Sequence, residues 1–178
     1  NAYTTWKDSR PVTLTETQRK EISEWFEAKK EVLPDNEYKG MFEGKNLIIL
    51  QIESLEQFVI NQKINGQEIT PVINSLLKNS LYFTNFYQQI NDGSSSDADL
   101  LANTSVYPLR RNSTFFRYPN TTYNSLPVLL EEKGYSTLAA HSDKGSFWNW
   151  MPALSAFGFD KCVDFSFFEL DECFGMGL

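Results

Sequence analysis

The sequence predicts an α/β fold in which helices flank a mostly parallel central sheet. Residues 46–52 form a continuous apolar run of strand length, which is typical of a strand buried on both faces. Strand-like and helix-like segments then alternate up to about residue 140, the pattern of a layered α/β sheet. The 178 residues are 41% apolar and 15% aromatic, so the chain has the material for a true core.

The first 44 residues are predicted to be a helix and a linker. Thr13-Leu14-Thr15-Glu16 has capping-box spacing, and the helix would run to about residue 33. Residues 34–44 contain the Pro, Asp, Asn and Gly residues that favour a linker. We therefore divide the chain into residues 1–44 and a domain of residues 45–178.

The first half of this domain is predicted to contain two strands and two helices. The strand at 46–52 ends at Glu53, and Thr70-Pro71 supplies a cap and first turn for a helix to about residue 78. Residues 81–87 are predicted to form the second strand. A loop containing three consecutive serines then leads into a helix over 96–103.

The second half is predicted to contain a helix, a third strand and a dense aromatic segment. The helix covers 125–133 and is stopped by Gly134. The strand covers 135–140, and residues 147–168 are expected to form a short helix with packing loops. We expect the late aromatic side chains to belong to the core: Phe157, Phe159, Phe165, Phe167 and Phe168.

Composition and charge exclude several classes of function. A net charge of −7 and few clustered basic residues argue against nucleic acid as a partner. No stretch has the length of a membrane span and the start lacks a secretion signal, so we expect any membrane anchor to lie outside this chain. Cys162 and Cys173 are compatible with one disulfide or with two buried thiols.

Three groups of polar residues follow predicted strands. They are Glu53, the loop at 93–97, and the pair His141 and Asp143. The carboxyl ends of parallel strands face the ligand crevice of such sheets, so we expect these groups to meet there.

A strand-end carboxylate and a hydroxyl at a helix N-terminus suit group transfer from an anionic ester. Both oxygens are ligands for a hard divalent cation, which would also activate the hydroxyl, and the helix N-terminus favours a phosphate or sulfate. The alternatives are structural: Glu53 caps the following segment, and the serines are turn and cap residues.

Four separated motifs make the chain resemble the lipoteichoic acid synthase and phosphoglycerol transferase group of sulfatase-like enzymes, in the alkaline phosphatase superfamily. The motifs occur in the order and spacing of that group: IILQIESLEQF, NDGSSSDADLLANTSVYPL, AAHSDKGSFWNW and AFGFDK. The resemblance runs from residue 46 to the end. It implies the N-terminal portion of an extracellular catalytic domain that transfers phosphoglycerol from a phosphatidylglycerol-like phospholipid to an envelope polymer.

The resemblance also assigns roles to individual residues. It implies that Ser95 is the nucleophile that forms a covalent phosphoester, and that Glu53 and Ser95 hold a divalent metal ion, Mn²⁺ first and Mg²⁺ as the alternative. His141, Asp143 and Trp148 would line the substrate pocket. Gly93, Ser96 and Asp97 would support the nucleophile, and Asp99 would be structural.

The sequence departs from this group at three points. Ser95 stands where the group has threonine, and a primary hydroxyl can do the same chemistry. Trp150 stands at a usual arginine, which would remove a phosphate-binding fork. The Asp-His pair that completes the metal site in the group lies beyond the equivalent of Leu178, so we expect an incomplete domain that is inactive alone and requires its C-terminal half.

The implied location is the extracellular face of the cell membrane of a Gram-positive-type bacterium. The alternatives are a phosphodiesterase or phosphatase that transfers the group to water, and a degenerate non-catalytic binding domain. A formylglycine sulfatase is disfavoured, because the residues after Ser95 lack the required Pro and Arg.

Overall fold

The computed structural model describes residues 3, 6, 7, 10, 13–30, 32, 34–119 and 121–169. The chain divides into two compact units, and each is treated by itself. One unit is Pro11–Tyr82, and the other combines Asn1–Arg10 with Phe83–Leu178. Cys173, and with it the expected state of the two cysteines, lies outside the described residues.

Helix α2 (Glu16–Lys29) confirms the predicted N-terminal helix. Its capping box begins at Thr15 instead of Thr13: the Gln18 N–H donates to the Thr15 hydroxyl, and the Thr15 N–H donates to the Gln18 side chain. The apolar residues of α2 are all exposed. Local capping and helix propensity therefore define this helix without a packed face.

The predicted strands at 46–52 and 81–87 are wrong for this structure. Neither segment belongs to a strand, and Ile48 and Leu50 are 88% and 79% exposed. A β-strand exists only through hydrogen bonds to a neighbour, and among the described residues no strand pairs with either segment. Apolar composition alone does not supply that neighbour.

Besides α2, the Pro11–Tyr82 unit contains a small hairpin and a further helix. Strands β1 (Lys63–Ile64) and β2 (Gln67–Glu68) pair antiparallel. Asn65 and Gly66 form the turn with φ of 53° and 83°; this Asn-Gly hairpin signal was missed in the sequence. The unit also contains η1 (Gln57–Val59), α3 (Pro71–Leu76) and η2 (Leu77–Asn79), and α3 confirms the helix predicted from Thr70-Pro71.

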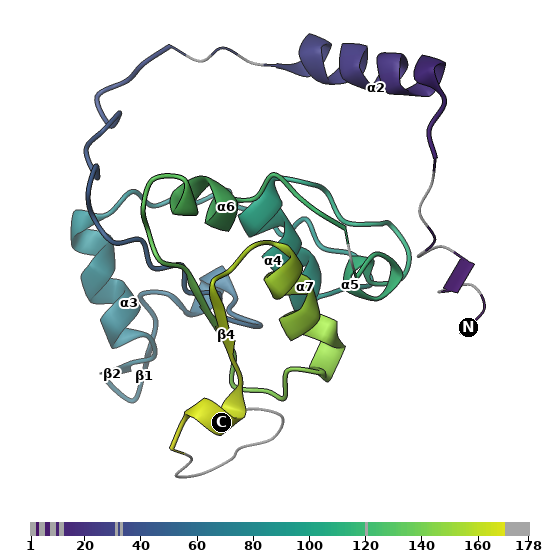
Figure 1. Cartoon of the computed structure of the whole chain (residues 1–178). Helices are drawn as coiled ribbons and strands as arrows, with labels where there is room; N and C mark the ends of the chain where they lie inside the picture. The colour runs from purple at the N-terminus through teal and green to yellow at the C-terminus, as the bar shows by residue number, and fades with distance from the viewer. Residues whose placement is uncertain are drawn as a thin grey trace. The chain divides into compact units, whose positions relative to one another are not determined.

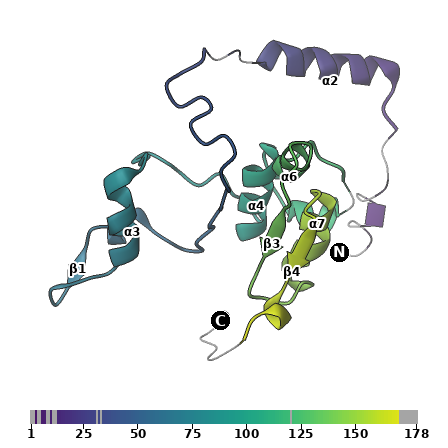
Figure 2. The same cartoon turned by 60° about the vertical axis from the view of Figure 1, so that its left-hand side comes forward.

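The second unit contains a short parallel strand pair with helices around it (Figures 1 and 2). Strands β3 (Leu138–Ala140) and β4 (Lys161–Val163) pair in parallel, with Ala139 opposite Cys162. Strand β3 confirms the third predicted strand, whereas β4 was not predicted. The helices are α4 (Ser95–Thr104), α5 (Thr114–Arg117), α6 (Leu126–Glu131), η3 (Phe147–Asn149), α7 (Trp150–Ala156) and η4 (Phe165–Phe167).

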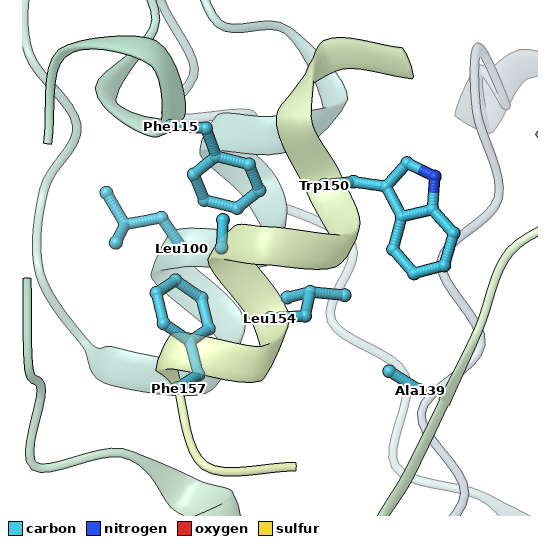
Figure 3. Close-up of a cluster of buried hydrophobic side chains, with 7 residues drawn as sticks. Leu100, Phe115, Ala139, Trp150, Leu154 and Phe157 are labelled. Carbon is cyan, nitrogen blue, oxygen red and sulfur yellow. The ribbon is translucent and has the colours of Figure 1, made fainter. Parts of the chain in front are cut away.

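The core of this unit gathers around α7. Figure 3 shows Leu100, Phe115 and Phe157 on one side of this helix and Trp150 on the side towards Ala139. Phe157 confirms the expectation of a core aromatic, and Phe159 packs against the cluster. The same expectation is wrong for Phe167 and Phe168, which are exposed because η4 follows the last described strand and leaves the core.

Candidate active site

Ser95 is the first residue of α4, as predicted for a nucleophile at a helix N-terminus. The side chain is half-buried, and the preceding residue, Ser94, is the N-cap. Ser94 adopts φ 49° and ψ −124°, a backbone conformation that is costly for a residue with a side chain. Such a conformation persists only where surrounding contacts impose it. Residues 91–97 make these contacts with one another and with the segment before α5, and we call them the nucleophile loop after the role expected of Ser95.

Asp97 holds the nucleophile loop from inside. Its carboxylate is fully buried, and Oδ2 accepts hydrogen bonds from the backbone N–H groups of Asn91 at 2.9 Å and Gly93 at 3.0 Å. A Cβ at position 93 would lie 2.0 Å from Asp97 Oδ1. Gly93 is therefore required because the carboxylate occupies the space of a side chain.

Two further hydrogen bonds connect the nucleophile loop to the segment before α5. The Ser96 hydroxyl donates to the Gly93 carbonyl oxygen at 2.6 Å and lies 3.2 Å from the hydroxyl of Ser113. The Asn112 N–H donates to the carboxylate of Asp92 at 2.8 Å. The supporting positions expected from the sequence are thus brought together, and Ser113 joins them although no sequence pattern indicated it.

His141 follows β3 and continues its pairing through a bond from its N–H to the carbonyl of Val163. The Asp143 N–H donates to His141 Nδ1 at 3.0 Å, and an Asp143 carboxylate oxygen lies 3.8 Å from the same nitrogen. Since Nδ1 is an acceptor, the neutral ring carries its proton on Nε2. His141 thereby presents a donor from Nε2.

Trp148 and Asp143 line a pocket of about 670 Å³ together with Phe116, Lys144, Ser146 and Phe147. Trp148 and Asn149 both have positive φ, at 47° and 57°, and the Asn149 amide donates to the carbonyl of Phe115 at 2.8 Å. The rings of Trp148 and Phe116 lie 6.0 Å apart. Asp143 and Trp148 therefore line the same pocket, as expected. Phe116 was missed because only the tertiary fold brings α5 to this pocket, and Lys144 was missed although it directly follows Asp143 in the sequence.

Trp150 is a core residue at the edge of this region. Its side chain is 2% exposed, its ring stacks on His141 at 5.1 Å with an interplanar angle of 22°, and its indole N–H donates to the Lys144 carbonyl at 2.9 Å. The position thus contributes an apolar support for His141 and no positive charge.

Asp99 lies one turn after Ser95 on α4. Burial raises the pKa of the Asp99 carboxyl from 3.8 to about 7. At neutral pH the carboxyl is therefore protonated to a much larger extent than an ordinary aspartate.

Glu53 lies in a turn of the other unit and is exposed. The expected meeting of Glu53 with Ser95 therefore remains a prediction. No group of three His, Cys, Asp or Glu side chains with metal-binding geometry occurs within the described part of the chain. Nor does any described helix have the length and apolar character needed to cross a membrane.

Comparison with known proteins identifies the family. The sulfatase family model matches residues 45–171, which is most of the chain. The chain belongs to the sulfatase family.

The relatives of this sulfatase-family chain include lipoteichoic acid synthases. Lipoteichoic acid synthase 2 of Bacillus subtilis strain 168 is 36% identical over 154 residues, which are 85% of this chain and 24% of that protein. Lipoteichoic acid synthase of Staphylococcus aureus strain USA300 is 36% identical over 143 residues, 78% of this chain and 22% of that protein. The chain thus spans about a quarter of the length of these relatives.

A solved structure shows the same fold. The crystal structure of the lipoteichoic acid synthase LtaP from Listeria monocytogenes aligns with a TM-score of 0.77 at 34% identity, covering 83% of this chain and 36% of that one. This similarity confirms the sulfatase-like α/β fold class predicted from the sequence, although two of the strands predicted within it are not formed.

Proposed function

We propose that this sulfatase-family protein transfers phosphoglycerol from a phosphatidylglycerol-like phospholipid to a glycerol phosphate polymer of the cell envelope, with Ser95 as the nucleophile. The observation that carries the proposal is the position of Ser95 at the N-terminus of α4, in a loop fixed by the buried Asp97. The identity to lipoteichoic acid synthases supports the choice of substrate class. On this proposal, residues 45–178 are the N-terminal portion of the catalytic domain.

In the first step the Ser95 Oγ attacks the phosphorus of the phospholipid. The new Ser95 O–P bond forms while the P–O bond to diacylglycerol breaks, and the proton lost by the serine ends on the diacylglycerol oxygen. In the second step a polymer hydroxyl attacks the same phosphorus and displaces Ser95, which regains a proton. The N–H groups of the first turn of α4 favour the negative charge of the phosphate throughout.

The pocket at Trp148 has the groups needed for a glycerol phosphate headgroup. Asp143 lines the pocket and offers a carboxylate that accepts from a glycerol hydroxyl. His141 is not one of the lining residues, but it contacts Asp143, and on this proposal its Nε2 donates to an oxygen of the substrate. The Trp148 and Phe116 rings give an apolar wall for the glycerol carbons. These groups orient the headgroup.

The donor chemistry fits a divalent cation. The carboxylate of Glu53 and the hydroxyl of Ser95 are oxygen ligands of the kind taken by Mn²⁺, our first choice, and by Mg²⁺. When bound, the cation supplies positive charge that lowers the pKa of the serine hydroxyl and offsets the phosphate charge.

The substrate class places the reaction at the outer face of the cell membrane of a Gram-positive-type bacterium. A phospholipid donor requires access to the bilayer, and an envelope polymer grows outside the cytoplasm. The net charge of −7 gives no long-range attraction to anionic headgroups, so a membrane anchor elsewhere in the protein would supply this access.

The decisive test compares Ser95→Ala with Ser95→Thr in the full-length protein. Ser95→Ala should abolish headgroup release from a fluorescent phosphatidylglycerol while the melting temperature changes little, because residue 95 provides little packing. Ser95→Thr keeps the hydroxyl and should retain substantial turnover with Mn²⁺ supplied. Ser94→Ala serves as the matched control and should be nearly silent.

Full activity in a folded Ser95→Ala protein would remove the mechanism. Trapping of a phosphoglycerol ester on Ser95 would support it. Product analysis separates transfer from hydrolysis, since a hydrolase yields free glycerol phosphate at the rate of headgroup release, whereas a transferase yields elongated polymer.

A further inference from the structure

Ser113 occupies an unusual place for a helix-capping serine. It is the N-cap of α5, yet its side chain makes no capping hydrogen bond to that helix. The hydroxyl is buried and faces Ser96 of the nucleophile loop at 3.2 Å instead. An N-cap serine ordinarily accepts a hydrogen bond from a backbone N–H group in the first turn of its own helix. In Ser113 the hydroxyl contacts Ser96 in place of that N–H group.

The direction of this hydrogen bond follows from counting protons. Ser96 has one hydroxyl proton, and its 2.6 Å bond to the Gly93 carbonyl requires that proton, because a carbonyl oxygen only accepts. Ser113 must therefore be the donor to Ser96. The result is a directed chain from the Ser113 hydroxyl through the Ser96 hydroxyl to the Gly93 carbonyl, and bonds in such a chain strengthen one another.

These hydrogen bonds hold the carbonyl group of Gly93, while the Asp97 carboxylate holds its N–H group. The strained Ser94 and then Ser95 come directly after it. The backbone that aims Ser95 is thus held by three buried side chains, of which Ser113 alone comes from another element.

The same element reaches the pocket. The carbonyl of Phe115 accepts from Asn149, and the Phe116 ring lies beside Trp148. Ser113 is therefore two or three positions from the contacts beside Trp148, and α5 forms a short connection between the nucleophile loop and the pocket.

We propose that Ser113 is a positioning residue: through Ser96 it fixes the Ser95 backbone in register with a headgroup held at Trp148. This inference rests on the proposed role of Ser95. Loss of the Ser113 hydroxyl should misplace the nucleophile without changing the groups that bind the headgroup.

The test is a series at position 113 in the full-length protein. Ser113→Ala should lower kcat about tenfold and leave KM for the phospholipid within about twofold, because small misalignments act on the chemical step. Ser113→Thr restores a donor and should recover most of kcat, and Ser113→Cys, a weak donor, should be intermediate. Amide hydrogen exchange should become faster at residues 93–96 in Ser113→Ala.

The matched control is Ser125, which is another buried N-cap serine of the same unit and donates to the carbonyl of Phe157. Ser125→Ala should lower the melting temperature and leave kcat of the folded protein unchanged. If Ser113→Ala does not fold, Ser113→Cys takes its place, with a smaller loss of kcat and a smaller increase in hydrogen exchange at residues 93–96.

Two results would overturn the proposal: an unchanged kcat in Ser113→Ala, or a Ser113→Thr protein as slow as Ser113→Ala. The activity of Ser95→Ala shows whether the positioning role of Ser113 or the proposed function itself is wrong. If Ser95→Ala is active, the nucleophile is wrong; if it is inactive while Ser113→Ala is fully active, only the positioning role is wrong.

Discussion

At the scale of single residues, the nucleophile loop depends on a steric constraint, because the Asp97 carboxylate leaves no room for a side chain at position 93. This carboxylate also accepts hydrogen bonds from two backbone N–H groups of the loop. Removing either partner therefore changes the other's surroundings. The glycine and the aspartate form one structural unit, although they lie four positions apart in the sequence.

A double-mutant cycle tests this coupling. Gly93→Ala should destabilise the protein by about 1–3 kcal/mol, because the new Cβ displaces the carboxylate and breaks its bonds. In an Asp97→Ala background the same change should cost much less, since the space is then open. Urea unfolding gives the four free energies, and additivity of the two changes would contradict the coupling.

At the scale of elements, α4 carries both Ser95, the proposed nucleophile, and a carboxyl whose pKa is raised by burial. Burial raises the pKa of Asp99 to about 7 in the folded protein, against 3.8 for the unperturbed group. Between these pH values the folded state binds more protons than the unfolded state. The contribution of Asp99 to stability is therefore fully present below about pH 4, falls as the pH rises, and is lost above about pH 7.

Asp99→Asn should remove this pH dependence, because an amide stays neutral. The variant should match the parent at pH 4 and be more stable at pH 8, by up to about 4 kcal/mol for a shift of this size. Thermal melts across the pH range measure the difference. As a control, Glu132→Gln changes an exposed position of the same unit, and its stability difference from the parent should not depend on pH in this way. If Asp99→Asn differs from the parent by the same amount at every pH, the raised pKa of Asp99 is refuted.

At the scale of the whole molecule, a long apolar segment remains open to solvent. The side chains of residues 47–50 and 52 are all exposed, although they have the composition of a buried strand. Such a segment exposes apolar surface, which favours association with another chain.

The 178-residue chain should therefore associate at increasing concentration. Placing lysines at the two most exposed positions, Ile48→Lys with Leu50→Lys, should weaken association because the charges oppose burial. Sedimentation velocity over a concentration series measures this. As a control, Gln62→Lys adds charge at an exposed polar position and should not weaken association. A sedimentation coefficient of the unmodified chain that does not change with concentration would contradict the expectation.

The sequence by itself determined the features that depend on neighbouring residues. The first turns of α3 and α6 follow from the prolines near their starts and, in α6, from the Ser125 cap. The motif resemblance likewise identified the sulfatase-like fold, because the order and spacing of motifs are properties of the sequence.

Only the tertiary structure decided which distant residues meet. Ser113 reaches Ser96, Phe116 reaches Trp148, and Trp150 stacks on His141, and no spacing in the sequence predicts these contacts. The strand predicted at residues 46–52 failed for the same reason. An apolar run favours burial, but a strand and a functional site both require contacts with residues that are distant in the sequence.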